Sequence, residues 1–269
     1  MTNTTFKDNV VIVTGASYGI GEEIANRLAE QGAWLALAAR DASRLEQVAA
    51  ECRKRGGRAI VVQTDVTEQA QCQNLIAQTI KEYGRIDTLC VNAGIGMWAM
   101  FDKVEDPGML DRIMRVNYLG AVYCTFFALP HLKQTRGRIV GVSSLTGKTG
   151  VPARTGYAAS KHAMVGFFDS LRIEVAQSGV SVTMTYPDFV ASGGRFRNLG
   201  IDGKPVKNAP PYAPGTMTSE TCARLIVQGA AKRQREVFMS TRGKIGQWVK
   251  LIAPGLIDRI ALKAIEQGE

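Results

Sequence analysis

Apolar positions along this chain fall into two alternating patterns. Short runs of β-branched or continuously apolar residues, typical of strands buried on both faces, occupy 10–14, 33–39, 58–64, 86–91, 138–144 and 180–186, with a weaker run at 236–240. Between them, stretches with apolar residues at helical spacing occupy 20–31, 42–55, 68–83, 109–132, 155–177 and 219–233. This alternation predicts one doubly wound α/β domain of the Rossmann type over residues 1–269. We expect a seven-stranded parallel sheet with helices on both faces.

The segment 188–217 interrupts this alternation. It is rich in Gly, Pro and Asn, has neither helical nor strand periodicity, and follows the sixth strand-like run. Long irregular loops in compact domains are usually functional or mobile, and ligands of open α/β sheets bind at the carboxyl edge. We therefore interpret 188–217 as a substrate lid. The alternative is a disordered surface insertion.

The sequence TGASYGIG at 14–21 joins the first strand to the first helix, with glycines at 15, 19 and 21. Its spacing is G-x-x-x-G-x-G rather than G-x-G-x-x-G. Glycine allows a tight turn and a close approach of backbone N–H groups to a phosphate, and the helix N-terminus adds positive charge. The pattern predicts a dinucleotide-binding turn, and an ordinary tight turn is the alternative.

The residues at the end of the second strand indicate which dinucleotide would bind. Enzymes that prefer NAD usually place a carboxylate there, whereas this chain has Ala39 followed by Arg40. A guanidinium can pair with a 2′-phosphate, so we expect NADP(H) rather than NAD(H). Asp41 is the alternative ribose ligand. Asp65, after the third strand, is a candidate ligand for the adenine amino group or a cap of the next helix.

Composition and charge exclude several other classes. The formal charge is +9, spread along the chain without a nucleic-acid-binding motif, so we expect no nucleic-acid partner. Five scattered cysteines without a C-x-x-C pair argue against a disulfide framework and a metal site, and favour reduced thiols. We find no signal-peptide pattern and no apolar run long enough to span a bilayer, so we expect a cytoplasmic protein.

Tyr157 precedes Lys161 by four residues in TGYAASKHAM, on one face of a predicted helix. By itself this spacing fits either a buried aromatic beside a solvated lysine or a phenol whose proton is exchanged. Further elements favour the second interpretation: VNAG at 91–94, Asn117 in RVNYLG and Ser144 in VSSLTG. With the glycine turn, these elements occur in the order of the short-chain dehydrogenase/reductase family, which the chain resembles over nearly its whole length. Residues 128–150 and 156–174 look like the 11β-hydroxysteroid dehydrogenase branch.

The resemblance implies a role for each matching residue. Tyr157 would be the general acid or base, and Lys161 would bind the nicotinamide ribose and lower the pKa of Tyr157. Ser144 would hydrogen-bond the substrate oxygen, and Asn117 would hold a water that links Lys161 to solvent. The cofactor would contact Gly15, Ser17, Tyr18, Gly19, Ile20, Gly21, Arg40, Asp65, Val66, Asn92, Ala93, Gly94, Tyr157, Lys161, Pro187 and Ser192.

Three positions depart from the family pattern. Val91 replaces the first Asn of N-N-A-G, so the hydrogen bonds that this Asn would make near the cofactor are not predicted for this chain. Asp188 follows Pro187 where glycine is usual, and it would either narrow the pocket or place a carboxylate near the substrate. Ser192 stands where a threonine often binds the nicotinamide carboxamide.

The C-terminal segment 243–265 predicts two short amphipathic helices with a basic face, separated at Pro254–Gly255. Three interpretations remain: a cover for a core face or dimer interface, a peripheral membrane contact, or a wall of the substrate pocket. The pocket wall is compatible with either of the others.

The leading functional hypothesis is an NADP(H)-dependent oxidoreductase that interconverts a ketone and a secondary alcohol on a bulky apolar substrate, such as a steroid or lipid. An epimerase or dehydratase with the same Tyr–Lys pair is one alternative. A cofactor-sensing protein without catalysis is another. By resemblance we expect a homodimer or homotetramer.

Overall fold

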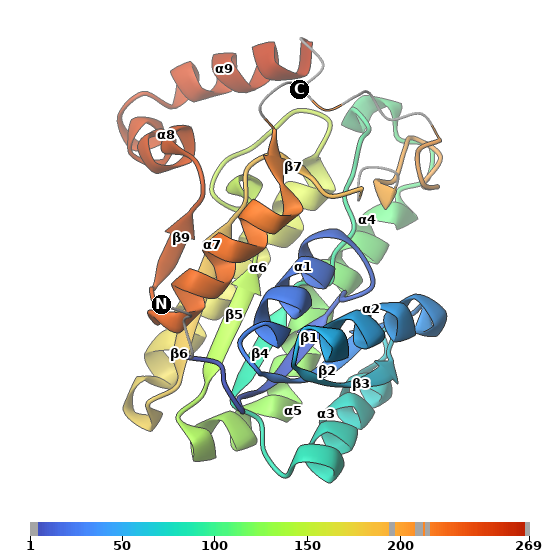
Figure 1. Cartoon of the computed structure of the whole chain (residues 1–269). Coiled ribbons are helices and arrows are strands. Elements are labelled where there is room, and N and C mark those ends of the chain that lie inside the picture. Colours follow the sequence, from blue (N-terminus) through green and yellow to red (C-terminus); the bar gives the residue numbers. More distant parts are fainter. Residues whose placement is uncertain (1–4, 194–196, 208–211, 213–215, 267–269) are drawn as a thin grey trace.

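The sheet follows the alternation of the sequence closely. The computed structural model describes residues 5–193, 197–207, 212 and 216–266. Seven parallel strands lie in the order β3-β2-β1-β4-β5-β6-β9 (Figure 1). The chain adds strands toward one edge of the sheet from β1 to β3, and then toward the other edge from β4 to β9. The strands are β1 Val10–Thr14, β2 Trp34–Ala39, β3 Arg58–Gln63, β4 Thr88–Val91, β5 Arg138–Val142, β6 Ser181–Tyr186 and β9 Glu236–Phe238. The predicted seven-stranded Rossmann-type domain is confirmed.

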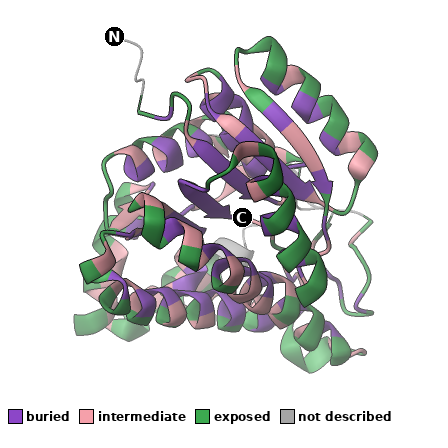
Figure 2. Cartoon of the chain, turned by 90° about the horizontal axis from the view of Figure 1, so that it is seen from below, coloured by how far each residue is buried: buried purple, intermediate pink, exposed green. Residues whose placement is uncertain are grey.

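Helices cover both faces of the sheet and enclose two apolar clusters. On one face lie α1 Gly19–Ala29, α2 Ala42–Lys54 and α7 Ser219–Ala231; on the other lie α3 Gln69–Tyr83, α5 Gly120–Thr135 and α6 Thr155–Glu174. The helices bury their sheet-facing sides and expose the opposite sides (Figure 2). The inner strands β1, β4 and β6 are buried almost throughout, whereas the edge strands β3 and β9 are only partly buried.

The single helix expected over 109–132 is divided. It consists of α4 Gly108–Met114, a π-helical turn Arg115–Leu119, and α5. The extra residue of a π turn changes the direction of the side chains, and such turns are frequent at functional sites. Here the turn contains Asn117, whose side chain is buried.

The segment expected to be a lid is partly ordered by short pairings. β7 Val190–Ala191 pairs in parallel with β8 Met217–Thr218, and Leu199 forms bridges with Met97 and Pro205. The backbone at Ser192 lies against the glycine turn, since a Cβ on Gly19 would meet the Ser192 carbonyl oxygen at 2.6 Å. Other parts of the predicted lid, 194–196, 208–211 and 213–215, lie outside the described residues.

Two helices follow β9, as the C-terminal pattern predicted. α8 Thr241–Ile252 and α9 Pro254–Glu266 are separated by Ala253, so the predicted break at Pro254–Gly255 instead forms the start of α9. Both helices lie beyond the carboxyl ends of the strands, at the top of Figure 1. Among the helices that the structure describes, none combines the length and the apolar character needed to cross a membrane.

Candidate active site

The glycine turn is shaped as a phosphate-binding loop requires. Gly15 and Gly19 have φ of +66° and +59°, a region in which other residues are strained. A Cβ on Gly21 would lie 2.2 Å from the Gly15 carbonyl oxygen. The Asn92 amide donates to the carbonyl oxygens of Thr14 (3.0 Å) and Gly15 (3.2 Å), which fixes the turn to the end of β4. The turn delivers the N-terminus of α1 to the cavity described below, so it fits a pyrophosphate.

Two arginines lie beside the Tyr18 ring of this turn. The guanidinium of Arg44 donates to the Ser17 carbonyl (3.1 Å), pairs with Glu22 (2.7 Å) and lies 5.1 Å from the centre of the Tyr18 ring. Arg197 lies 4.1 Å from the centre of the same ring. Neither arginine was singled out from the sequence. Arg44 lies in the first turn of α2, and only the packing of α1 beside α2 brings it to the glycine turn.

The carboxylates considered as cofactor ligands have local partners. Asp41 accepts a hydrogen bond from the Arg44 backbone N–H (2.9 Å) and caps α2. Asp65 accepts from the backbone N–H and the hydroxyl of Thr67, at 3.0 and 2.8 Å. Arg40 lies at the exposed end of β2, where its carbonyl accepts from Gln63 (2.9 Å). Five of the predicted site residues are not among the described residues that line the cavity: Ser17, Arg40, Asp65, Val66 and Asn117.

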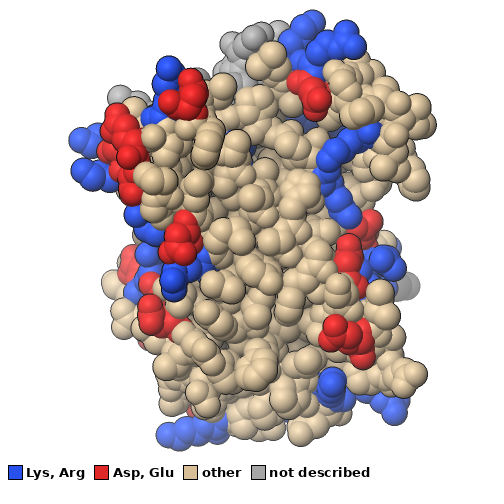
Figure 3. All heavy atoms as spheres, turned by 180° about the vertical axis from the view of Figure 1, so that it is seen from behind, with Lys and Arg blue, Asp and Glu red and all other residues tan. Residues whose placement is uncertain are grey.

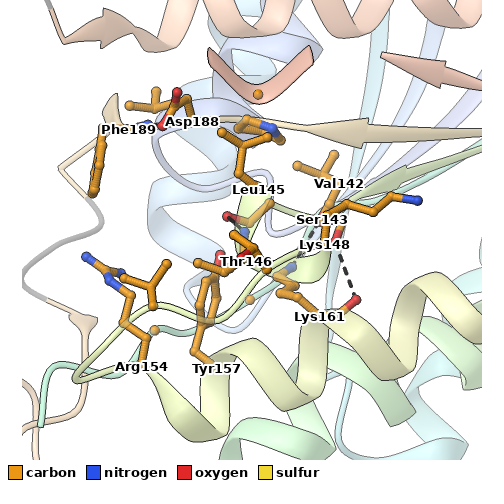
Figure 4. A pocket seen from close by; sticks show the side chains of 18 of the residues that line it. Val142, Ser143, Leu145, Thr146, Lys148, Arg154, Tyr157, Lys161, Asp188 and Phe189 are labelled. Carbon is orange, nitrogen blue, oxygen red and sulfur yellow. Dashed lines mark hydrogen bonds between the residues drawn. The ribbon is translucent and has the colours of Figure 1, made fainter. Parts of the chain in front are cut away.

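Ser144, Tyr157 and Lys161 line a cavity of about 650 Å³, which extends from the glycine turn to α8 and α9. Figure 4 shows Tyr157 and Lys161 projecting from α6. Ser144 follows β5, where the chain leaves the sheet earlier than the predicted strand 138–144, and its hydroxyl accepts from the Thr146 N–H (3.2 Å). Tyr157 and Lys161 project from the first turns of α6. Gly15, Tyr18, Gly19, Ile20, Gly21, Asn92, Ala93, Gly94, Pro187 and Ser192 also line this cavity.

The environment of Tyr157 sets the state of its phenol. Burial raises its pKa above the ordinary value of a tyrosine. The positive charge of Arg154 opposes this effect, followed by the hydrogen bond between Tyr157 and Ser144. The sequence directed attention to Lys161 for that electrostatic role and missed Arg154, which lies three residues before Tyr157. Arg154 is the N-cap residue of α6, outside its helical turns, so helical spacing does not relate it to Tyr157 and no local pattern would have identified it.

Lys161 is buried and donates to the Val142 carbonyl (2.9 Å), and its Nζ lies 5.8 Å from the centre of the Tyr157 ring. Burial lowers its pKa to about 8. The Asn117 amide donates to the Ile95 carbonyl and the Ser160 hydroxyl, each at 2.9 Å. Asn117 and Lys161 meet at Gly94, where a Cβ would lie 3.2 Å from Asn117 Oδ1 and 3.6 Å from Lys161 Nζ. The fold thus brings all four residues expected to be catalytic to one site.

Asp188 does not extend its carboxylate toward Tyr157. It accepts hydrogen bonds from Arg242 Nε (2.6 Å), Arg242 Nη2 (2.7 Å) and the Ser240 hydroxyl (2.6 Å). Ser240 in turn caps α8 by accepting from the Gly243 N–H (3.1 Å). The residue that replaces the usual glycine therefore fastens the C-terminal helices to the loop after β6.

The C-terminal helices form the outer wall of the cavity, which is one of the three interpretations of segment 243–265. Their contribution is mainly apolar: Ile245 and Val249 from α8, and Leu256, Ile257 and Ile260 from α9. Among the described residues no group of three or more His, Cys, Asp or Glu could hold a metal ion. All five cysteines are buried and outside any disulfide.

Known proteins are similar to this chain in sequence and in fold. A family model described as short chain dehydrogenase matches residues 9–197. The 11-beta-hydroxysteroid dehydrogenase-like protein 4A of Arabidopsis thaliana is 37% identical over 249 residues, which cover 92% of this chain and 82% of that protein.

Two solved structures extend the comparison. A short chain dehydrogenase/reductase from Burkholderia phymatum, in complex with NAD, has a TM-score of 0.82 at 23% identity and covers 94% of this chain and 96% of its own. An alcohol dehydrogenase from the archaeon Thermococcus sibiricus, complexed with 5-hydroxy-NADP, has a TM-score of 0.74 at 26% identity, covering 86% and 95%. The matching model covers well over half of the chain, and the chain belongs to the short-chain dehydrogenase/reductase family of oxidoreductases.

Proposed function

We propose that this protein is an NADP(H)-dependent oxidoreductase that interconverts a ketone and a secondary alcohol with a bulky apolar body. The observation that carries the proposal is the cavity itself. It begins at the glycine turn, passes Ser144, Tyr157 and Lys161, and ends under the apolar side chains of α8 and α9. A dinucleotide and an apolar substrate would thus meet at the phenol.

Each residue of the site has a separate role in the proposed reduction of a ketone. A reduced nicotinamide, when bound, supplies a hydride to the carbonyl carbon. Tyr157 donates its proton to the carbonyl oxygen, so that the C=O bond becomes an alcohol, and the reverse reaction returns the proton to Tyr157. The Ser144 hydroxyl donates to the same oxygen and stabilises its developing negative charge. Lys161, held by Val142, adds positive charge beside the phenol and binds the cofactor ribose.

Several features favour NADP(H) over NAD(H). β2 ends in Ala39 and Arg40 rather than in a carboxylate, and Asp41 already caps α2. The guanidinium of Arg44 beside Tyr18 is paired with Glu22, so Arg40 is the arginine that would bind a 2′-phosphate. A 2′-phosphate beside Arg40 would form charge-assisted hydrogen bonds, which an NAD ribose cannot provide.

The experiment that tests the proposal measures substrate-driven NADPH loss with a panel of bulky apolar ketones, on wild type and Tyr157→Phe. Stoichiometric oxidation of NADPH with formation of the alcohol, lost in the variant, is the expected result. Conversion of a substrate without net change in NADPH would favour the epimerase or dehydratase class, since those reactions regenerate their cofactor. Tight cofactor binding without any turnover would favour a sensing protein.

A second copy of the chain fits the face that carries α5 and α6. On the face of the molecule behind the sheet of Figure 1, charged side chains lie around the rim and the centre is uncharged (Figure 3). Phe126 on α5 and Ile173 on α6 are 68% and 75% exposed. Such apolar side chains are typical of subunit interfaces, so we expect a homo-oligomer. Analytical ultracentrifugation of wild type and Phe126→Glu tests it, and a monomeric wild type would contradict it.

The outer surface of α8 and α9 fits an anionic membrane surface. Trp248, Leu251 and Ile252 are 66%, 75% and 87% exposed, and Lys244 and Arg259 lie on the same helices. Exposed Trp and Leu beside basic residues suit a lipid interface, so we expect peripheral contact. Flotation with vesicles of phosphatidylcholine and phosphatidylserine tests this, with Trp248→Glu expected to reduce binding. A wild type that stays out of the vesicle fraction at low salt would contradict it.

A further inference from the structure

A buried hydroxyl beside Tyr157 has no role in the reaction proposed above. Thr146 lies in the 3₁₀ turn Leu145–Gly147, directly after Ser144, and it is 7% exposed. It lines the cavity, and its side chain lies next to that of Tyr157 (Figure 4). Its Oγ1 makes no hydrogen bond of ordinary length and angle with any described group. A buried hydroxyl without such a bond costs free energy and is expected to serve a purpose.

The turn holds Thr146 in a fixed position relative to Ser144. The Thr146 N–H donates to the Ser144 hydroxyl oxygen (3.2 Å), and the Gly147 N–H donates to the Ser144 carbonyl (2.9 Å). A Cβ on Gly147 would lie 2.5 Å from Ser143 Oγ, so the turn packs closely on the end of β5. Threonine is β-branched, which restricts its χ1 torsion and hence the directions open to its hydroxyl.

The phenol of Tyr157 is the group that gains from a nearby hydroxyl. Burial raises the pKa of Tyr157, and the charge of Arg154 opposes this effect, followed by the hydroxyls of Ser144 and Thr146. A hydroxyl that donates to the phenolate favours the charged form, which is the direction expected here. The neutral phenol leaves Thr146 without ordinary hydrogen-bond geometry, whereas a phenolate attracts donors more strongly and at shorter distance.

We propose that Thr146 is a positioning residue for Tyr157, and that its hydroxyl donates a hydrogen bond to the phenolate that accepts the proton of an alcohol substrate. This inference rests on the proposed ketone–alcohol chemistry and adds one residue to it. In the oxidation, the O–H and C–H bonds of the alcohol break, and the hydride goes to the oxidised nicotinamide. The C=O bond and the O–H bond of Tyr157 form, while Thr146 keeps its own proton.

The two hydroxyls of the turn then have separate tasks. A serine hydroxyl carries one proton, and in the proposed reaction Ser144 donates that proton to the substrate oxygen. It cannot donate to the phenolate at the same time. Thr146 supplies the missing donor, so the phenolate keeps a hydrogen bond while substrate is bound. Its hydroxyl is unpaired with the neutral phenol and paired with the phenolate, which stabilises the reacting form selectively.

Spectroscopic titration of the phenolate tests this without turnover. Tyr157 is titrated by its ultraviolet absorbance in the NADP⁺ complex, with the matching Tyr157→Phe protein subtracted to remove the other tyrosines. We expect Thr146→Val, which replaces the hydroxyl with a methyl group, to raise the midpoint by about one pH unit, a tenfold loss of phenolate. Thr146→Ser should restore it. Thr149→Val, the same change elsewhere in the cavity lining, should leave it in place.

The pH profile of alcohol oxidation provides a second readout. Its rising limb should move upward with the titration midpoint in Thr146→Val and return in Thr146→Ser. The stability of Thr146→Val toward urea should equal or exceed that of wild type, because a hydroxyl without an ordinary hydrogen bond is replaced by a group of the same shape. A purely structural hydroxyl would show the opposite: lower stability and an unchanged profile.

Two results would overturn the inference: a midpoint that does not move in Thr146→Val, or an equal movement in Thr149→Val. An unmoved midpoint in an enzyme whose turnover requires Tyr157 would reject the role of Thr146 and support the proposed reaction. A midpoint that moves in Thr146→Val, in a protein that turns over no ketone or alcohol, would support the contact with Tyr157 and count against the reaction.

Discussion

The carboxylate of Asp188 accepts two hydrogen bonds from the guanidinium of Arg242, at 2.6 and 2.7 Å. Asp188 follows β6 and Arg242 begins α8, so this pair joins two segments that are 54 residues apart in the chain. The side chains of α8 beyond Arg242 line the cavity. The pair therefore determines where the outer wall of the substrate site lies.

Asp188→Asn should loosen this wall. We expect a loss of about 1–3 kcal/mol in the stability of α8 packing, because Arg242 keeps a neutral acceptor only. Hydrogen exchange of residues 241–252 should become faster, and KM for an apolar ketone should rise with little change in NADPH affinity. Arg259→Gln on α9 serves as control. Unchanged exchange in α8 would contradict a fastening role for Asp188.

The same pair predicts a pH dependence. Burial raises the pKa of Asp188, but its hydrogen bonds from Arg242 and Ser240 lower the pKa more, and the net direction is downward. The stabilisation is present above the pKa of an unfolded aspartate, about 3.9, and is lost as pH falls through the lower folded value. The stability difference between wild type and Asp188→Asn should thus be constant near pH 7 and shrink in acid. Thermal denaturation at several pH values measures it.

Lys161→Met should stabilise the fold while abolishing turnover. Burial lowers the pKa of Lys161 from 10.5 to about 8, so the buried ammonium costs about 3 kcal/mol at pH 7. Loss of its hydrogen bond to Val142 offsets about 1 kcal/mol, which leaves a gain of about 2 kcal/mol. Because the folded pKa is lower, wild-type stability should rise between about pH 8 and 10, and the advantage of the variant should disappear there.

Thermal or urea denaturation from pH 7 to 10 checks this expectation for Lys161. Lys54→Met, on the exposed end of α2, is the matched control. A Lys161→Met protein that is less stable than wild type at pH 7 would show that the hydrogen bond outweighs the desolvation of the ammonium.

The pH profiles of the two reaction directions should differ. Burial raises the pKa of Tyr157, so its phenol keeps the proton in the neutral range. Ketone reduction, which consumes that proton, should be nearly independent of pH from 6 to 8, while alcohol oxidation, which needs the phenolate, should rise with pH. Tyr157→Phe should lower both by about 10²–10⁴-fold, with Tyr123→Phe as control. A flat oxidation profile would contradict this role.

Cofactor preference should depend on the end of β2. We expect wild type to bind NADPH more tightly than NADH, and Arg40→Ala or Ala39→Asp to reduce the ratio by about tenfold, through lost pairing or added repulsion with a 2′-phosphate. Arg53→Ala, at the far end of α2, is the control. Equal or tighter binding of NADH by wild type would show that Arg40 is a surface charge, and Asp41 would then be the candidate ribose ligand.

The local sequence was sufficient to predict the seven strands of the parallel sheet and where each lies along the chain. Strands buried on both faces are nearly continuous apolar runs, so segments such as 10–14 and 33–39 can be recognised from the sequence. The glycine turn and the Tyr157–Lys161 spacing are likewise local, because a turn and one helical face each depend on few neighbouring residues. The Ser144, Tyr157 and Lys161 cluster follows from these elements and the family order.

Contacts between distant segments were decided only by the tertiary structure. Asp188 could have faced the substrate or the protein, and Arg242, 54 residues later, determines that it is paired. The positions of Arg44 beside Tyr18, and of Trp98 and Phe189 around Arg154, depend on helix and loop packing. Desolvation of Lys161 also depends on what surrounds it. Burial and charge pairing are properties of the folded surroundings, and no local pattern of residues encodes them.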